Sequence, residues 1–368
     1  MVDTIIKNMC TGCSSCMNIC PKEAIKMISD SEGFNYPVID RALCIECMLC
    51  EKVCPSLNLI KENHFINMKI YAAWSLNEVI RNESTSGGIF SEIALEILDC
   101  GGYICGAIYN EEFGVEHYIT NKVSDLSKIR QSKYVQSDMN YIYKEILKLL
   151  VNEKKVLFCG SPCECAGINH YLNINKINCS RLILVDFVCR GANSPKVYKS
   201  FLDSLEKKYQ SKINKVWFKN KKYGWNRFST KIEFANGHTY LEDRFNDIYI
   251  RGYIESNLFI RPSCSQCLYK GFPKSSDITL ADFWGIKLED KTKNTDLGTS
   301  LVILNSDIGI ELFENIKSRI FYESNNLESA IEGNYCINNS IIHGENRTEF
   351  MSSLETMDII DNIKRFLQ

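Results

Sequence analysis

Hydrophobic and polar positions from residue 68 onward follow two patterns in turn, short apolar runs and longer segments with helical spacing. Residues 69–74 and 103–109 are predicted strands, and residues 89–98 between them have the spacing of an amphipathic helix. A strand, a turn with glycine or proline, and a helical segment follow at residues 154–158 and again at 181–188. Two successive strand–turn–helix units are typical of a parallel sheet.

The C-terminal half adds strands of another kind. Residues 227–234 and 238–241 flank Asn236-Gly237, a pair that favours a β-hairpin with a type I′ turn. Later strands are expected at residues 277–280 and 299–304, the second followed by a helix, and the C-terminal segment shows weak helical periodicity. We therefore expect an α/β domain with a mixed, partly parallel sheet.

The first 60 residues are organised by cysteine instead. Eight cysteines form two runs, each followed by proline, and the runs repeat with a period of 34 residues, from Cys10 to Cys44. Between them, residues 23–28 are predicted as a short helix and 34–39 as a short strand, which are too small to bury a core without a ligand. The polar residues 61–67 are expected to be a linker.

Both runs match C-x2-C-x2-C-x3-C-P, the pattern of proteins that hold two [4Fe–4S] clusters. In that pattern the fourth cysteine of each run binds the other cluster. The expected ligand sets are Cys10, Cys13, Cys16 and Cys54 for the first cluster, and Cys44, Cys47, Cys50 and Cys20 for the second. A pair of zinc sites or a disulfide knot is the alternative, although zinc runs usually need only two CxxC pairs at longer separation.

Composition mainly excludes partners. The 368 residues are 45% hydrophobic and 24% charged, as in a globular protein of two or three domains. A net charge of −2 gives no general field for nucleic acid or an anionic membrane, and no run approaches the roughly 18 apolar residues of a spanning helix. We expect a cytoplasmic, anaerobic setting without nucleic acid or membrane insertion, where dense cysteines bind metal more often than they form disulfides.

Ten further cysteines are scattered along the chain. Cys264 and Cys267 form a CxxC in a polar turn, and Cys163 and Cys189 follow two successive strands that should end at the same edge of the sheet. These four are the best candidates for a third iron–sulfur site, which spacing alone leaves open. Cys165, two residues from Cys163, remains an alternative ligand, and the others are expected to be buried as small hydrophobic residues.

A longer series of motifs runs through the chain: Ser84-Thr-Ser-Gly-Gly-Ile-Phe90, Gly160-Ser-Pro-Cys163, Asp186-Phe-Val-Cys-Arg-Gly191, Lys222-Tyr-Gly-Trp225, Cys264-Ser-Gln-Cys267, Ser276-Asp-Ile278 and Asp282-Phe-Trp-Gly285. With the doubled cysteine run before them, they resemble the coenzyme F-420 hydrogenase/dehydrogenase beta-subunit family, in family order. The resemblance implies FAD and one [4Fe–4S] cluster on Cys163, Cys189, Cys264 and Cys267. Ala281 departs from the family, which commonly has glycine there.

The glycine-rich turn at residues 84–88 is predicted to begin a helix, with Ser86 as its cap. Free backbone N–H groups at such a helix start can hold a phosphate, although a plain cap is the alternative. Lys133 is either a positive charge near the cofactor or a solvated surface lysine. Together with the motifs, the resemblance implies FAD contacts at Ser86, Gly87, Gly88, Lys133, Tyr134, Ser161, Gly191, Asp282, Gly298 and Ser300. No catalytic residue is identified.

The loop of residues 219–227 interleaves basic and aromatic side chains, which suits a planar anionic redox cofactor. The alternative is a solvated lead-in to the hairpin, with Trp225 packed on the sheet.

The expected organisation is an α+β ferredoxin-like two-cluster module at residues 1–62, then an α/β flavin-binding domain whose N-terminal part spans 68–150. Its C-terminal part, residues 151–325, would carry the third cluster, and residues 326–368 would form a helical tail.

Iron–sulfur clusters carry single electrons, whereas most organic redox substrates exchange electron pairs, and a flavin connects the two. We therefore predict an iron–sulfur flavoprotein oxidoreductase that passes electrons between ferredoxin-type clusters, FAD and a two-electron carrier. Expected partners are ferredoxin or another redox protein and a small-molecule substrate or coenzyme F-420-like deazaflavin, within a homo-oligomer or redox complex. The alternatives are an electron-relay subunit without a substrate site and a zinc-stabilised interaction protein.

Overall fold

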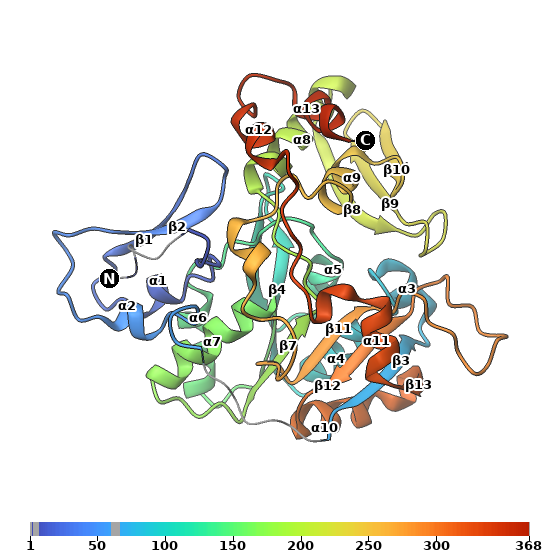
Figure 1. Ribbon diagram of the computed structural model, residues 1–368. Helices are drawn as coiled ribbons and strands as arrows, with labels where there is room; N and C mark the ends of the chain where they lie inside the picture. The colour runs from blue at the N-terminus through green and yellow to red at the C-terminus, as the bar shows by residue number, and fades with distance from the viewer. Residues whose placement is uncertain (1, 3–6, 60–66, 368) are drawn as a thin grey trace.

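A computed structural model describes residues 2, 7–59 and 67–367 of the chain (Figure 1). The predicted linker at residues 61–67 lies, apart from its last residue, outside the described residues. The described residues contain no helix that is both long and apolar enough to cross a membrane.

The N-terminal module is built as an internal repeat. Helices α1 (Ser15–Ile19) and α2 (Leu49–Lys52) each follow a residue in the left-handed conformation, Ser14 with φ 62° and Met48 with φ 61°. Gly12 and Glu46, two residues earlier in each run, also have positive φ. The repeat of the sequence is therefore a repeat of the backbone around the cysteines.

The helix predicted at residues 23–28 is wrong. The structure has a strand there, β1 (Ile25–Ser29), which pairs antiparallel with β2 (Asn35–Ile39). Ile25 and Ile39 face each other across the hairpin and are both buried. Pairing with the neighbouring strand thus overrides a helical pattern that is too short to be stable alone.

The predicted mixed sheet is confirmed. Within the described residues, eight strands form one sheet in the order β13-β3-β12-β11-β7-β6-β4-β5. The neighbours β11, β7, β6 and β4 run parallel, and the remaining pairs are antiparallel. The strands are β3 (Lys69–Ser75), β4 (Tyr103–Tyr109), β5 (Val115–Thr120), β6 (Val156–Cys159), β7 (Leu182–Phe187), β11 (Ile278–Asp282), β12 (Ser300–Leu304) and β13 (Ile320–Asn325).

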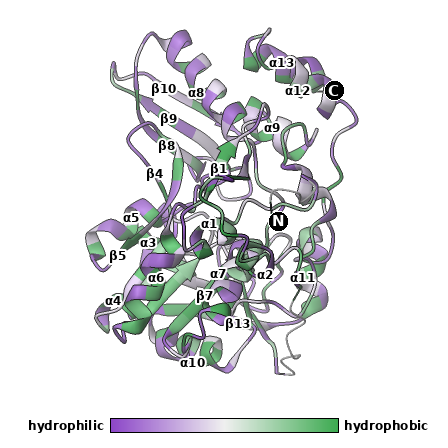
Figure 2. Ribbon diagram, turned by 90° about the vertical axis from the view of Figure 1, so that its left-hand side faces the viewer, coloured by the Kyte–Doolittle hydropathy of each residue, from purple (hydrophilic) through white to green (hydrophobic). Residues whose placement is uncertain are grey.

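Helices cover both faces of this sheet, because successive side chains of a strand point to opposite faces. Leu157 of β6 packs in a core with α4 (Ile89–Asp99) and α10 (Asp307–Ile316). Its neighbours Val156 and Phe158 pack on the other face with α6 (Ile142–Val151) and α7 (Pro162–Ile174). The N-terminal module shares this second core. Figure 2 shows how strongly hydrophobic residues gather in the large sheet. Short helices α3 (Glu78–Glu83) and α5 (Leu126–Ile129) lie at its periphery.

A second layer stands above the large sheet in Figure 1. It is an antiparallel sheet of β8 (Ile213–Asn220), β9 (Ser229–Phe234) and β10 (Thr239–Asp243), packed with α8 (Pro195–Tyr209) and α9 (Ile248–Ile254). The C-terminal segment divides between the layers. Helix α11 (Leu327–Gly333) packs on the large sheet, whereas α12 (Arg347–Ser352) and α13 (Ile359–Phe366) pack on the upper core.

The hairpin of β9 and β10 forms where predicted, but its turn is not type I′. Such a turn needs positive φ at both central residues, and among Ala235, Asn236 and Gly237 only Gly237 has it, with φ 85°. The N–H of Phe234 bonds to the carbonyl of His238 and the N–H of Gly237 bonds to that of Phe234. The connection is therefore a three-residue loop that ends in a left-handed glycine.

Candidate iron–sulfur and cofactor-binding site

The first expected thiol set is gathered on the side of the N-terminal module that faces α7. Cys10, Cys13, Cys16 and Cys54 are each 8% exposed. Burial raises the pKa of Cys54 to about 12, and Cys13 and Cys10 add to the rise. Burial also raises the pKa of Cys16 well above its ordinary value, with further contributions from Cys13, Cys10 and Cys54. These mutual effects need short separations, so the structure brings the set together across the two runs.

The second expected set lies on a more exposed side of the module. Cys20, Cys44, Cys47 and Cys50 line one small cavity, whose other walls are mainly apolar. Cys47 is exposed, and the N–H of Ala24 donates to the Sγ of Cys20 at 3.3 Å. Backbone N–H groups that point at sulfur are typical of the loops around iron–sulfur clusters.

Both sets fit iron–sulfur chemistry. Among the described residues no two cysteines are joined by a disulfide bond. Burial disfavours a bare thiolate, whereas a thiol that binds metal is deprotonated outright, so a cluster would remove the cost of burial. No three His, Cys, Asp or Glu side chains in the described parts of the chain converge on a single ion, an arrangement that a cluster of four irons does not require.

A third set of thiols lies where β6 and β7 end. Burial raises the pKa of Cys163, in the first turn of α7, and Glu164, Cys189 and Cys267 add to the rise. Burial also raises the pKa of Cys189, against the effect of Lys270, and Cys264 and Cys267 contribute. Since β6 and β7 are parallel neighbours, their carboxyl ends meet at the same edge, as expected. The structure thus brings Cys163, Cys189, Cys264 and Cys267 together.

Cys165 has a different environment. It is fully buried between strand and helix, with its Sγ 3.9 Å and 3.8 Å from the carbonyl oxygens of Gly160 and Val185. Of the other cysteines outside the sets, Cys105 is buried as expected, but Cys100 is exposed.

The first and third sets adjoin each other. A Cβ on Gly167 of α7 would come within 3.2 Å of the Cβ of Cys13. Burial raises the pKa of Tyr269, two residues beyond Cys267, and Cys13, Cys163 and Cys54 add to the rise. The Tyr269 hydroxyl therefore lies within electrostatic reach of both sets.

Several expected FAD residues pack into one cluster. Ser86 does not cap α4: its Oγ donates to the carbonyl of Thr299 at 2.7 Å, and Gly88 takes the cap position with φ 89°. The N–H of Gly87 donates to the Oγ of Ser300 at 2.9 Å. A Cβ on Gly298 would come within 2.4 Å of the Ser86 carbonyl oxygen. Close packing of two chain segments explains the glycines.

The basic-aromatic loop reaches this cluster. The Nζ of Lys221 donates to the carbonyls of Ser86 and Leu297, at 2.6 Å and 3.0 Å, and burial lowers its pKa to about 7. Arg81, whose Nε donates to the Gly298 carbonyl at 2.9 Å, lies beside it. Lys219 is close enough to lower the pKa of Lys221 further.

Asp282 organises the aromatic part of the loop. Its carboxylate accepts from the Nζ of Lys219 and from the Nε1 of Trp225, both at 2.7 Å. Trp225 is 1% exposed and stacks on Trp284, with ring centroids 4.5 Å apart. The packed alternative for Trp225 is therefore correct, although the cationic side chains beside it remain grouped around Ser86.

Lys133 is not a surface lysine. It is 6% exposed, and its Nζ donates to four carbonyls at and beyond the end of α5, from Lys128 to Gln131, at 2.8–3.0 Å. Burial lowers its pKa to about 7. Tyr134 lies near Asp282, which adds to the rise that burial causes in the pKa of Tyr134.

Ser161 and Gly191 lie at the third thiol set instead. The Ser161 Oγ is 3.2 Å from the Sγ of Cys163, and a Cβ on Gly191 would come within 3.3 Å of the Cβ of Cys264.

Sequence reasoning missed two buried charges near these sites. Asp186 is fully buried, neither of its oxygens has a hydrogen-bond partner, and burial raises its pKa to about 6. Arg261 is fully buried against Cys10. A charged residue inside the apolar run 181–188 was a signal for Asp186, whereas nothing local marked Arg261.

Comparison with known proteins places these features in families. Residues 153–330 match the C terminus of the coenzyme F420 hydrogenase/dehydrogenase beta subunit, and residues 9–58 match the 4Fe-4S dicluster domain. A ferredoxin-like protein of Haemophilus influenzae is 41% identical over 63 residues, which cover 16% of this chain and 67% of that protein. One subunit of the H(2):CoB-CoM heterodisulfide,ferredoxin reductase of Methanothermobacter thermautotrophicus is 35% identical over 63 residues, 14% of this chain and 10% of that protein.

The chain spans less than half the length of the first curated relatives it matches. A chain in the structure of the F420-reducing [NiFe] hydrogenase complex of Methanosarcina barkeri is similar over 81% of this chain and 90% of its own length, with a TM-score of 0.47 and 15% identity. Taken together, the family matches make this an iron–sulfur electron-transfer protein. The chain belongs to the coenzyme F420 hydrogenase/dehydrogenase beta-subunit family and carries an N-terminal 4Fe-4S dicluster domain.

Proposed function

We propose that this chain is an iron–sulfur flavoprotein oxidoreductase, which passes electrons between three [4Fe–4S] clusters and FAD and on to, or from, a two-electron carrier. The observation that carries the proposal is the adjacency of the first and third thiol sets at Gly167 and Tyr269. Adjacent clusters allow an electron to pass from the dicluster module into the large domain. A coenzyme F-420-like deazaflavin or another organic molecule is the proposed carrier.

The ligands follow from the three sets. Cys10, Cys13, Cys16 and Cys54 would hold the first cluster; Cys20, Cys44, Cys47 and Cys50 the second; and Cys163, Cys189, Cys264 and Cys267 the third. We assign Cys163 rather than Cys165 because only the pKa of Cys163 is raised by Cys189 and Cys267.

The region around Ser86 suits the phosphates of FAD. Arg81, Lys219 and Lys221 lie together there with Asp282 as their anionic neighbour, which leaves an excess of positive charge. Gly87 and Gly298 allow the backbone to pack where a Cβ would collide. FAD bound here would accept electrons singly and release them as a pair. The wider set of proposed contacts is Ser86, Gly87, Gly88, Lys133, Tyr134, Ser161, Gly191, Asp282, Gly298 and Ser300.

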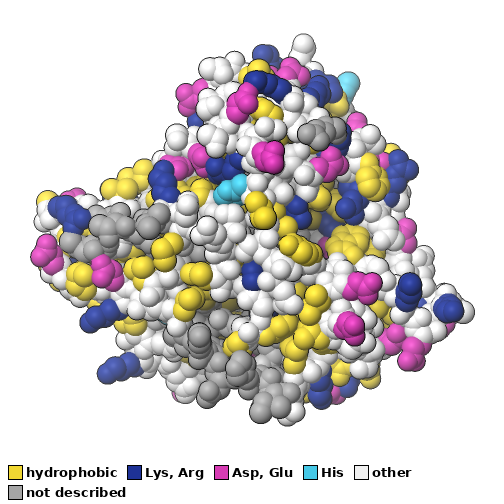
Figure 3. Space-filling view, viewed as in Figure 1, with side chains coloured by type: hydrophobic (Ala, Val, Ile, Leu, Met, Phe, Trp, Pro, Cys, Tyr) yellow, Lys and Arg dark blue, Asp and Glu magenta, His cyan; other side chains and the backbone are white. Residues whose placement is uncertain are grey.

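A relay subunit without its own substrate site is the second candidate. The apolar side chains of Leu43, Ile45 and Met48 are 36–56% exposed around Cys47, and Leu57 and Leu59 are exposed nearby. Figure 3 shows hydrophobic side chains on this module at the left of the view. Such a surface suits docking on a larger redox complex, and one relative is named as part of a reductase of several subunits.

An anaerobic electron-transfer experiment separates the two functions. The protein is mixed with reduced ferredoxin, the flavin absorbance is followed, and a deazaflavin or nicotinamide acceptor is then added. Bleaching followed by turnover of an acceptor supports the oxidoreductase, and bleaching without turnover supports the relay. Absence of any flavin absorbance contradicts both.

A further inference from the structure

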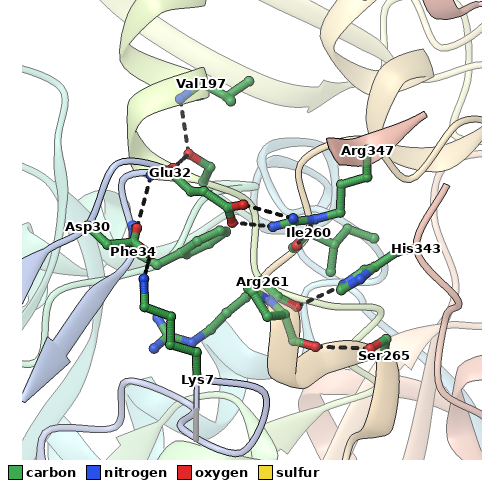
Figure 4. A network of polar contacts seen from close by, with 12 residues as sticks. Lys7, Asp30, Glu32, Phe34, Val197, Ile260, Arg261, Ser265, His343 and Arg347 are labelled. Atoms are coloured by element: carbon green, nitrogen blue, oxygen red, sulfur yellow. Dashed lines mark hydrogen bonds and ion pairs between the residues drawn. The ribbon is translucent and has the colours of Figure 1, made fainter. Parts of the chain in front are cut away.

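We propose that Arg261 raises the reduction potential of the first cluster and links this cluster mechanically to the third. The inference rests on the proposed function, because it takes Cys10 and Cys264 as cluster ligands. Figure 4 shows the polar network around Arg261, between the β1–β2 hairpin, the loop before Cys264 and the C-terminal segment.

The guanidinium group of Arg261 is bound directly to the first set. It is fully buried, its Nε donates to the carbonyl of Cys10 at 2.8 Å, and its Nη2 donates to the Sγ of Cys10 at 3.7 Å. Two further bonds, to the Asn35 carbonyl at 2.9 Å and the Gln136 side chain at 2.8 Å, fix its plane. The rings of Tyr36 and Phe34 lie 4.5 Å and 5.3 Å from it.

No carboxylate pairs with this cation among the described residues. The two acidic side chains of the hairpin turn are engaged elsewhere: Asp30 pairs with Lys7, and Glu32 pairs with Arg347. A buried charge without a partner is costly, so the site needs an anion. A cluster on four thiolates supplies it, since Cys10 is the ligand that the guanidinium group touches.

The backbone of the same residue holds the third set. The N–H of Arg261 donates to the Ala192 carbonyl at 2.8 Å, and its own carbonyl accepts from the N–H of Cys264 at 3.0 Å. Gly12, with φ +74°, lets the side chain in, because a Cβ there would lie 2.8 Å from the Nη1 of Arg261. One residue therefore sets both the turn of Cys264 and the position of a cation on Cys10.

A positive charge and a hydrogen bond at a ligand sulfur favour the reduced, more negative form of a cluster. Arg261 moves no electron or proton itself. By raising the potential of the first cluster, it makes that cluster a better acceptor for electrons from the more exposed second cluster. Arg261 is thus a positioning and tuning residue.

The test is a redox titration of the anaerobic full-length protein, followed by electron paramagnetic resonance, with iron analysis of every sample. Arg261→Gln removes the charge, Arg261→Lys keeps it but loses the planar set of bonds, and Arg347→Gln is the matched control. Arg347 donates to the neighbouring Ile260 carbonyl at 3.1 Å, so its loss disturbs the same loop without touching sulfur.

We expect Arg261→Gln to lower the midpoint potential of one cluster at unchanged iron content, Arg261→Lys to lower it less, and Arg347→Gln to leave it unchanged. Wild-type potentials in Arg261→Gln, or an equal shift in Arg347→Gln, would overturn the inference. If Arg261→Gln fails to assemble, Arg261→Lys decides: a lowered midpoint supports tuning, and an unchanged one refutes it. Wild-type protein that binds no cluster refutes the proposed function instead.

Discussion

Arg261 and Asp186 show two ways in which this chain treats a buried charge. The cation of Arg261 is bound on every side, whereas both oxygens of Asp186 lack a partner and the pKa of Asp186 is raised by burial to about 6. Lys274 is the charge that opposes this rise. At the residue scale, charges near the thiol sets are therefore placed individually.

Replacing one cysteine tests the third ligand set. In Cys189→Ser or Cys264→Ser we expect loss of the third cluster only, since the ligands of the other two lie in the N-terminal module. Iron should fall from about twelve to about eight atoms per chain, at four per cluster. Cys100→Ser, at an exposed cysteine outside the sets, is the control and should keep all the iron. Full iron content in both test variants would refute the assignment.

Cysteine ligands could be predicted because their spacing is local, within runs of eleven residues or in a CxxC. Arg261 could not, because it meets Cys10 across 251 positions of sequence. The roles of Ser86 and Lys133 were also out of reach, since the bond from Ser86 to Thr299 and the carbonyls around Lys133 depend on how loops pack.

Helices and strands followed the sequence pattern best in the large sheet. The predicted strand at 103–109 is β4 with the same bounds, and the helix at 89–98 is α4 with one residue more. Errors came where a neighbour decides, as in β1, which needs β2 to form, and in the turn at Gly237. Side-chain periodicity cannot report such pairing.

The first turn of α9 yields an element-scale prediction about pH. Asp247 caps this helix by accepting from the N–H of Ile250 at 2.6 Å, and burial raises its pKa to about 6. Its bound proton therefore stabilises the fold below about pH 4, and this stability is lost as the pH rises through about 6. The total is about 3 kcal/mol, at 1.36 kcal/mol per pKa unit.

Asp247→Asn keeps a good cap and removes the titration. In chemical unfolding, the stability of the variant relative to wild type should increase by about 1 kcal/mol between pH 5 and pH 8. The exposed cap Asp358→Asn, on α13, is the control. A constant difference between variant and wild type across this range would count against a raised pKa.

On the scale of the whole molecule, the dicluster module is fastened to the large domain at three places. Helix α1 packs on α6 and α7, Arg261 joins the two thiol sets, and Arg347 of the C-terminal segment pairs with Glu32 of the β1–β2 hairpin. The C-terminal segment, whose pattern suggested only weak helices, thus holds the module in place. The first and third thiol sets face each other at this junction, while the second remains near the surface.

Iron and flavin analysis of anaerobically purified protein tests the central claim most directly, namely that three clusters and one flavin share this chain. The account predicts about twelve iron atoms and about one FAD per chain, at four irons per cluster. Protein with four iron atoms or fewer, or without flavin, would contradict it.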